Sequence, residues 1–232
     1  MIENRSSCIK VSDTKICPFC YSPKIIKNGK TKTKKQQYIC KNCKKRFLDY
    51  YSYNAYKPNI NRKIIQLTKE GAGIRSTARL LEISPTTLLS KIISIAKNIV
   101  QPPLPIGQIY EVDEIRTYVK DKDKLIWIIY ALERQTKNVV SFNIGRRTNK
   151  TLIKVISTLE YSNPAKIFTD KLKNYKYLID QKIHSTRNRG INHIERKNLT
   201  LRTHLKRLSR RTICFSKSIV ILDAILKIYF WG

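Results

Sequence analysis

Acidic residues are scarce in this chain. Its 232 residues include 16 Asp and Glu against 47 Lys and Arg, which gives a formal net charge of +31. A field of this sign attracts polyanions, and nucleic acid is the commonest large polyanion. An AT-rich genome also favours lysine, but that explanation does not account for the lack of acids. We therefore expect a nucleic-acid partner, and every carboxylate inside an apolar segment becomes a candidate for chemistry.

Long apolar runs are absent as well. No segment approaches the roughly 20 residues that cross a bilayer, and the first residues, MIENRSSCIK, lack the apolar stretch of a signal peptide. No long basic amphipathic segment stands alone, so a membrane surface is a less favoured partner than nucleic acid. With 41% hydrophobic residues the chain can still bury a core. These features predict a folded cytoplasmic protein.

Cysteine is infrequent but occurs in pairs. Cys17 and Cys20 form one CxxC motif, Cys40 and Cys43 form a second, and nineteen residues separate the two motifs. Two such turns can present four thiolates tetrahedrally to Zn²⁺. Two disulfides are the alternative, and they are less favoured in an intracellular chain. The sequence therefore predicts a zinc-binding module over residues 1–50, in which zinc is structural and the many lysines contact DNA phosphates.

Residues 59–100 are predicted to form an all-α helix-turn-helix domain. Apolar residues recur at helical spacing in three short segments, and Ser84-Pro85 provides a cap followed by proline at the first helical position. The short break before Pro85 is typical of the DNA-binding motif. A simple bundle that packs its own core is the alternative. The third helix would contact DNA through Thr86, Thr87, Ser90 and Lys91.

A proline-rich break at residues 101–107 precedes a change in residue composition and periodicity, so we expect a third domain over residues 108–232. Its runs of β-branched and aromatic residues predict a three-stranded hairpin arrangement followed by helix, strand and helices, which is an α/β plan of the ribonuclease H type. The predicted strands are Ile109–Val119, Leu125–Leu132, Val139–Ile144 and Lys166–Thr169, and the predicted helices begin near Thr148, Tyr175, Asn192 and residue 216.

Three acids in this third domain are the candidate catalytic residues and magnesium ligands: Asp113, Asp170 and Glu195. Phosphodiester cleavage and joining are served by two divalent ions held by carboxylates, and Mg²⁺ or Mn²⁺ suits oxygen ligands. Asp113 interrupts a strand, Asp170 follows one, and Glu195 opens a helix. Asp170 could instead cap the next helix, and Glu195 could pair with Arg202.

The alternation of side chains along a strand indicates which neighbouring acids can share a site with Asp113. Asp113 and Glu114 are expected to point to opposite faces of the strand and therefore not to share a site. Glu111 lies on the Asp113 face and is the fallback candidate.

With these residues identified, the chain resembles the DDE transposases of the insertion-sequence-one family over nearly its whole length. The resemblance rests on CPFC…CKNC, YEVDEIRTYV, FTDKLKNY and, above all, HIERKNLTLRTHLKRLSRRTICFSKS. It implies a ribonuclease H-like catalytic domain that depends on a divalent metal and acts on terminal inverted repeats. Relatives often carry a basic residue seven positions after the catalytic Glu, which Arg202 matches, whereas Lys171 stands where relatives tend to have Gly.

The resemblance implies a prokaryotic, nucleoid-associated enzyme that binds double-stranded DNA at element ends and target, forms a homo-oligomer on DNA and performs 3′-end cleavage and strand transfer. Arg202 and Lys206 are its further predicted DNA contacts. Two alternatives stay open: a non-catalytic sequence-specific DNA-binding regulator, and a metal-dependent nuclease that cuts without joining.

Overall fold

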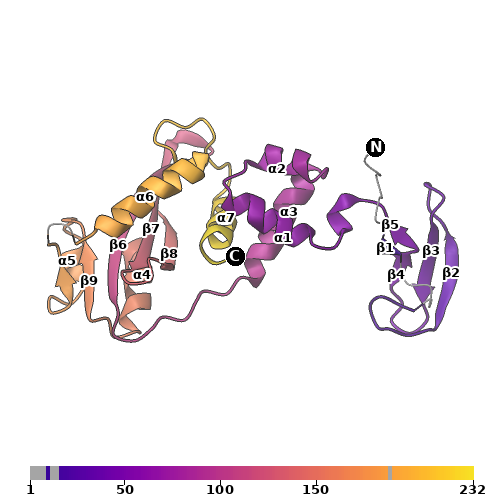
Figure 1. The fold of residues 1–232 in the computed structure, drawn as a ribbon, viewed down its shortest axis with the longest axis horizontal. Coiled ribbons are helices and arrows are strands. Elements are labelled where there is room, and N and C mark those ends of the chain that lie inside the picture. Colours follow the sequence, from indigo (N-terminus) through magenta and orange to yellow (C-terminus); the bar gives the residue numbers. More distant parts are fainter. Residues whose placement is uncertain (1–8, 11–15, 188–189) are drawn as a thin grey trace.

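The computed structural model describes residues 9–10, 16–187 and 190–232. Figure 1 shows a small β module set apart from a group of helices, which in turn packs against a larger sheet. The first residues of the predicted zinc module therefore lie mostly outside the described residues.

The N-terminal β module contains two small antiparallel sheets. The three-stranded one has the order β2 (Ile25–Lys30), β3 (Gln36–Cys40) and β4 (Arg46–Leu48), and β1 (Ile9–Lys10) pairs with β5 (Tyr50–Tyr51). Its buried residues are Cys17, Cys40 and Phe47. An apolar core this small cannot stabilise a fold alone, so the module needs an additional cross-link.

Three helices follow a short 3-10 turn, η1 (Asn54–Tyr56). They are α1 (Ile60–Lys69), α2 (Ile74–Leu80) and α3 (Pro85–Asn98). The predicted start of α3 is confirmed, because Ser84 is the N-cap and its side chain accepts a hydrogen bond from the Thr87 backbone N–H.

The large sheet is mixed and has the strand order β10-β9-β6-β7-β8. β7 pairs antiparallel with both β6 and β8, whereas β9 runs parallel to β6 and to β10. The strands are β6 (Ile109–Val119), β7 (Asp121–Glu133), β8 (Val139–Gly145), β9 (Lys166–Thr169) and β10 (His184–Ser185). The remaining helical segments are α4 (Asn149–Glu160), α5 (Tyr175–Leu178), α6 (Asn192–His204), η2 (Lys206–Leu208) and α7 (Ile219–Trp231). The predicted mixed α/β sheet with flanking helices is confirmed.

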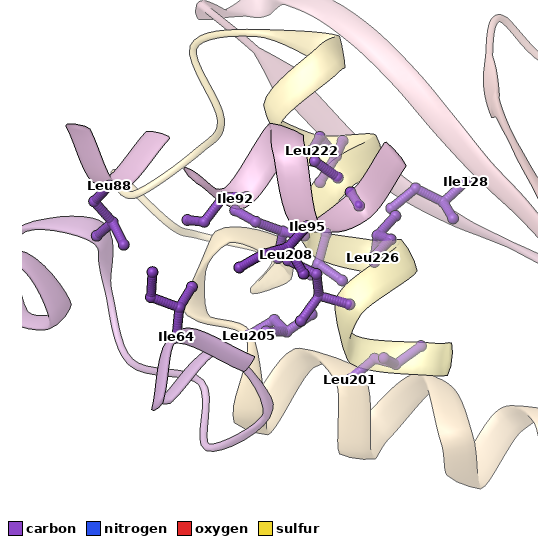
Figure 2. Close-up of a cluster of buried hydrophobic side chains, with 14 of the residues drawn as sticks. Ile64, Leu88, Ile92, Ile95, Ile128, Leu201, Leu205, Leu208, Leu222 and Leu226 are labelled. Carbon is purple, nitrogen blue, oxygen red and sulfur yellow. The ribbon is translucent and has the colours of Figure 1, made fainter. Parts of the chain in front are cut away.

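Side-chain alternation gives the sheet two buried faces. Tyr110, Val112 and Ile129 pack with α4 on one face, and Ile115 and Ile128 pack with α6 and α7 on the other. The second face continues into the N-terminal helices. Figure 2 shows Ile64 of α1 and Ile92 of α3 in one cluster with Leu222 and Leu226 of α7. The three helices therefore share their core with the α/β sheet, through the last helix of the chain.

Gly71 marks a close approach between the N-terminal helices and α6. Its φ is +73°, and a Cβ at this position would lie 2.1 Å from the carbonyl oxygen of His204. We expect Gly71→Ala to lower the free energy of unfolding by about 3 kcal/mol, because backbone strain and a backbone clash act together. Gly107→Ala is the matched control: its φ is +74° and nothing lies within 4 Å of the added Cβ, so only the strain of about 1 kcal/mol remains. Denaturant unfolding compares the two, and equal losses would contradict the close approach.

Candidate active site

The acidic site lies beside β6, at the point where the neighbouring strand β9 ends. β9 runs parallel to β6 only as far as the pair Val112–Thr169, and Asp170 follows immediately. The carboxyl ends of parallel strands are where ligands gather in α/β sheets. Carboxylate oxygens of Asp113, Glu114 and Asp170 all lie within 4.8 Å of one another. The structure thus brings two of the three predicted acids together and adds a third that the sequence analysis had set aside.

Glu114 joins this cluster although it points to the face opposite Asp113. Asp113 Oδ2 accepts a hydrogen bond from Asn198 of α6 at 2.6 Å, whereas Glu114 Oε1 accepts one from the Tyr175 hydroxyl at 2.7 Å. The alternation was right, but the expectation that the two acids could not share a site is wrong. Because β9 ends at Thr169, Asp170 lies beside the edge of β6, within reach of side chains from both faces.

The surroundings of Asp113 and Glu114 disfavour the charged form of both carboxylates. Burial is the main reason that the pKa of Asp113 is raised to about 6, and the charges of Glu114 and Asp170 act in the same direction. Burial also raises the pKa of Glu114, against the opposing effects of Tyr175 and Arg147. Three crowded carboxylates, of which Asp113 and Glu114 are desolvated, gain free energy by binding a cation, and oxygen donors of this kind suit Mg²⁺ or Mn²⁺.

One face of α6 forms the wall of a pocket of about 770 Å³ over these acids. Glu195, Asn198 and Arg202, each about one turn further along the helix, all line it together with Asp113 and Glu114. Glu195 is exposed, and its carboxylate is not part of the cluster in which the other three converge. The third predicted acid therefore lines the same pocket as Asp113 but lies outside the carboxylate cluster.

Glu111, the fallback candidate, has a different surrounding. Its side chain is fully buried and accepts hydrogen bonds from the backbone N–H groups of His193 and Ile194, at 3.1 and 3.0 Å. His193 Nδ1 and Arg134 Nε lie 2.7 and 3.6 Å from its other oxygen. A carboxylate at this position satisfies the free N–H groups of the first turn of α6. Glu111 thus holds the helix that carries Glu195, Asn198 and Arg202.

Three residues of the site were not among those predicted from the sequence: Arg147, Tyr175 and Asn198. Arg147 Nη2 lies 3.1 Å from Glu114 Oε2 and 3.6 Å from Asp170 Oδ2. Asn198 could have been found, because it stands three positions after Glu195 and so on the same helical face. Arg147 comes from the β8–α4 connection and Tyr175 from the short helix α5, and the position of both relative to the acids depends on the tertiary fold.

The four cysteines of the paired motifs converge in the N-terminal module. Their Sγ atoms all lie within 4.8 Å of one another, with Cys17–Cys43 and Cys20–Cys40 separations of 3.6 Å. All four thiols are free. Backbone N–H groups of Cys43 and Asn42 lower the pKa of Cys40 to about 6, which favours the thiolate that binds metal. This donor set fits Zn²⁺.

The predicted DNA contacts differ in how freely they can reach DNA. Thr86 and Ser90 are exposed and Lys91 is half-buried, all on α3, and Lys206 is exposed. The Thr87 hydroxyl is already engaged, since it lies 2.8 Å from Ser84 Oγ and accepts from the Tyr53 hydroxyl at 3.2 Å. Arg202 lines the acidic pocket, and its buried Nε has no hydrogen-bond partner among the described residues.

A strongly basic chain with a four-thiolate cluster, three short helices and a carboxylate cluster open to a pocket is typical of proteins that bind and process DNA. The comparisons identify the family. Residues 108–231 match the family described as IS1 transposase, and residues 51–98 match the InsA C-terminal domain. This chain belongs to the IS1 transposase family.

Its relatives include InsB proteins of insertion elements. The chain is 35% identical to the insertion element iso-IS1n protein InsB of Shigella dysenteriae, over 51% of this chain and 90% of that protein. It is 36% identical to the insertion element IS1 protein InsB of Shigella flexneri, over 51% and 91%. It is 35% identical to the insertion element IS1 4 protein InsB of Escherichia coli K12, over 56% and 78%. Among the described residues, no helix combines the length and apolarity needed to span a membrane.

Proposed function

We propose that this protein is a DDE-type DNA transposase that binds the inverted-repeat ends of its element and catalyses metal-dependent 3′-end cleavage and strand transfer. The observation that carries the proposal is the convergence of Asp113 and Asp170 at the open edge of β6, together with the pocket that Asp113 and Glu195 line. The membership of the IS1 transposase family supports the same reading.

The proposed catalytic residues are Asp113, Asp170 and Glu195, with Glu114 as a further candidate ligand. Bound Mg²⁺ or Mn²⁺ would supply the positive charge that stabilises the attacking and leaving oxygens of a phosphodiester. Asn198 and the Glu114 backbone N–H each donate to one oxygen of Asp113 and hold the carboxylate in place. Glu114 is fixed in the same way by Tyr175. Arg202 and the exposed Arg210 line the same pocket and can hold DNA phosphates beside the acids.

The N-terminal parts are proposed to hold the DNA. Residues 1–50 would form a zinc module, in which Cys17, Cys20, Cys40 and Cys43 bind a structural Zn²⁺. Residues 59–100 would act as a helix-turn-helix, with the first turn of α3 in the major groove and Thr86 and Ser90 free to contact it. Residues 108–232 would form the ribonuclease H-like catalytic domain. A homo-oligomer on DNA would bring two element ends together.

The test uses purified full-length protein and a labelled duplex carrying one end of the element, with Mg²⁺ and a target plasmid. We expect release of a 3′-hydroxyl at the end of the element, followed by joining of that end to the plasmid, with no covalent protein–DNA link. Specific binding to the end without any cleavage would favour the regulator. Cleavage that never leads to joining would favour the plain nuclease.

A further inference from the structure

Arg147 lies where it can neutralise the acidic cluster. It follows β8 in the short connection to α4, and Nη2 contacts both Glu114 Oε2 at 3.1 Å and Asp170 Oδ2 at 3.6 Å. Its guanidinium also stacks over the ring of Trp127, 4.7 Å from the centroid. In the described part of the chain, Arg147 is the only basic side chain that forms an ion pair with Asp113, Glu114 or Asp170.

The position of Arg147 is the one that a bound cation would need. Glu114 and Asp170 belong to the group of carboxylates whose oxygens converge within 4.8 Å, and a single nitrogen atom of Arg147 bridges these two. The hydrogen bonds that orient the acids come from other residues: Tyr175 holds Glu114 and Asn198 holds Asp113. Asp170 Oδ1 accepts from the Leu172 backbone N–H at 2.9 Å, so each of the three carboxylates keeps an orienting hydrogen bond if the guanidinium leaves.

We propose that Arg147 is a built-in counter-ion, a positioning residue that occupies the divalent-cation site of the free protein and must be displaced when metal binds. The proposal rests on the proposed function, since it assumes that these acids bind the catalytic metal. Arg147 occupies Glu114 Oε2 and Asp170 Oδ2, and the other oxygens of these two acids already accept from the Tyr175 hydroxyl and the Leu172 backbone N–H. A metal ion that bridges Glu114 and Asp170 must therefore replace the Arg147 ion pairs. The arginine lowers the affinity for metal while it keeps the metal-free carboxylates from repelling one another.

Displacement is feasible because Arg147 is only loosely enclosed. About a third of its side chain is exposed, compared with 2% for Glu114, so the guanidinium can swing toward solvent while Glu114 stays buried. Guanidinium groups also bind phosphate, through paired N–H donors. DNA in the pocket therefore offers Arg147 another anionic partner after it has left the carboxylates.

The experiment measures Mn²⁺ binding to the full chain without DNA, by electron paramagnetic resonance and calorimetry, with the zinc site loaded. An opposite charge at this distance changes the proton affinity of a carboxylate by roughly tenfold or more. We expect Arg147→Met to bind Mn²⁺ about tenfold more tightly than wild type, for the same electrostatic reason. The matched control is Arg146→Met, which removes the same charge from the exposed neighbouring residue and should change the affinity much less.

Unchanged or weaker Mn²⁺ binding by Arg147→Met would overturn the proposal, as would an equal gain in Arg146→Met. If Arg147→Met does not fold, Arg147→Lys serves instead. It keeps the charge but cannot form the planar fork, so a smaller gain in affinity is expected, and no gain would overturn the proposal. Asp113→Asn distinguishes a failure of the counter-ion proposal from a failure of the proposed function. If wild type and Asp113→Asn bind Mn²⁺ equally poorly, with or without DNA, the proposed catalytic metal site itself is wrong.

Discussion

Asp113→Asn protein is expected to lose at least about 100-fold in both strand cleavage and strand joining, while its affinity for the element end is unchanged or slightly higher. The substitution keeps the size of the side chain and removes one negative charge from the cluster formed with Glu114 and Asp170. A weaker metal site loses the stabilisation of the charge that develops on the reacting oxygens. The repulsion between the pocket and DNA phosphates also falls, which is why binding persists.

The surroundings of Asp113 sharpen this expectation. Asn198 donates to one oxygen at 2.6 Å and the backbone N–H of Glu114 donates to the other at 2.8 Å. An amide at position 113 can accept only one of these hydrogen bonds, because its other end is itself a donor. The variant therefore loses both charge and orientation. The measurement is the labelled-end assay with Mg²⁺, and Mn²⁺ is expected to replace Mg²⁺ in wild type.

The matched control for this variant is Asp123→Asn. Asp123 is exposed on β7, so the same chemical change should leave cleavage at the wild-type rate. If Asp113→Asn cuts as fast as wild type, Asp113 is not a catalytic residue. Glu195→Gln and Glu114→Gln in the same assay decide which acid completes the site. Loss in the first and retention in the second would favour Glu195, and the reverse would favour Glu114.

Cys40→Ser is expected to release zinc and to unfold the N-terminal β module. Cys40 is fully buried in a core that it shares with Cys17 and Phe47. Structural zinc in small modules contributes an apparent binding free energy of about 10–16 kcal/mol, and this energy is also folding energy. Among the described residues of this module, no apolar core is large enough to replace it. The sheet of β6–β10 should remain folded, because it has a core of its own.

Elemental analysis and hydrogen exchange check this second expectation. Wild type should contain one zinc per chain, and exchange in Cys40→Ser should become fast over the strands of the N-terminal β module only. Cys214→Ser is the control, since Cys214 is an exposed thiol outside the four-thiolate cluster. Zinc-free wild-type protein with oxidised thiols would show that the cysteines form disulfides instead.

Local patterns were sufficient to predict most of the elements. The β-branched runs gave β6 and β9 with their observed ends, and Ser84-Pro85 gave the start of α3. The spacing of the cysteines predicted their convergence. These features depend on periodicity, capping and short-range spacing, all of which are encoded within a few residues.

Local sequence patterns could not show which acids converge in the acidic cluster. Whether Glu114 can reach Asp170 depends on β9 ending at Thr169, which is a matter of register between strands far apart in the chain. The position of Arg147 between the two acids depends on how the β8–α4 connection folds over them. Periodicity also could not show that α7 packs on α3, because an apolar helical face does not identify its partner.

The packing of α7 fixes the distance between α3 and the acidic edge of β6. α7 buries Leu222 and Leu226 against the helices that include α3, and its Trp231 donates to the Val139 carbonyl of β8 at 2.7 Å. The Tyr229 hydroxyl of the same helix lies 2.8 Å from Nδ1 of His204, at the end of α6. We expect α3 and the acidic edge of β6 to move as one rigid piece. If α3 binds DNA as proposed, such a piece would present one particular phosphodiester bond to the acids, and the cut site would lie at a fixed number of base pairs from the recognised sequence.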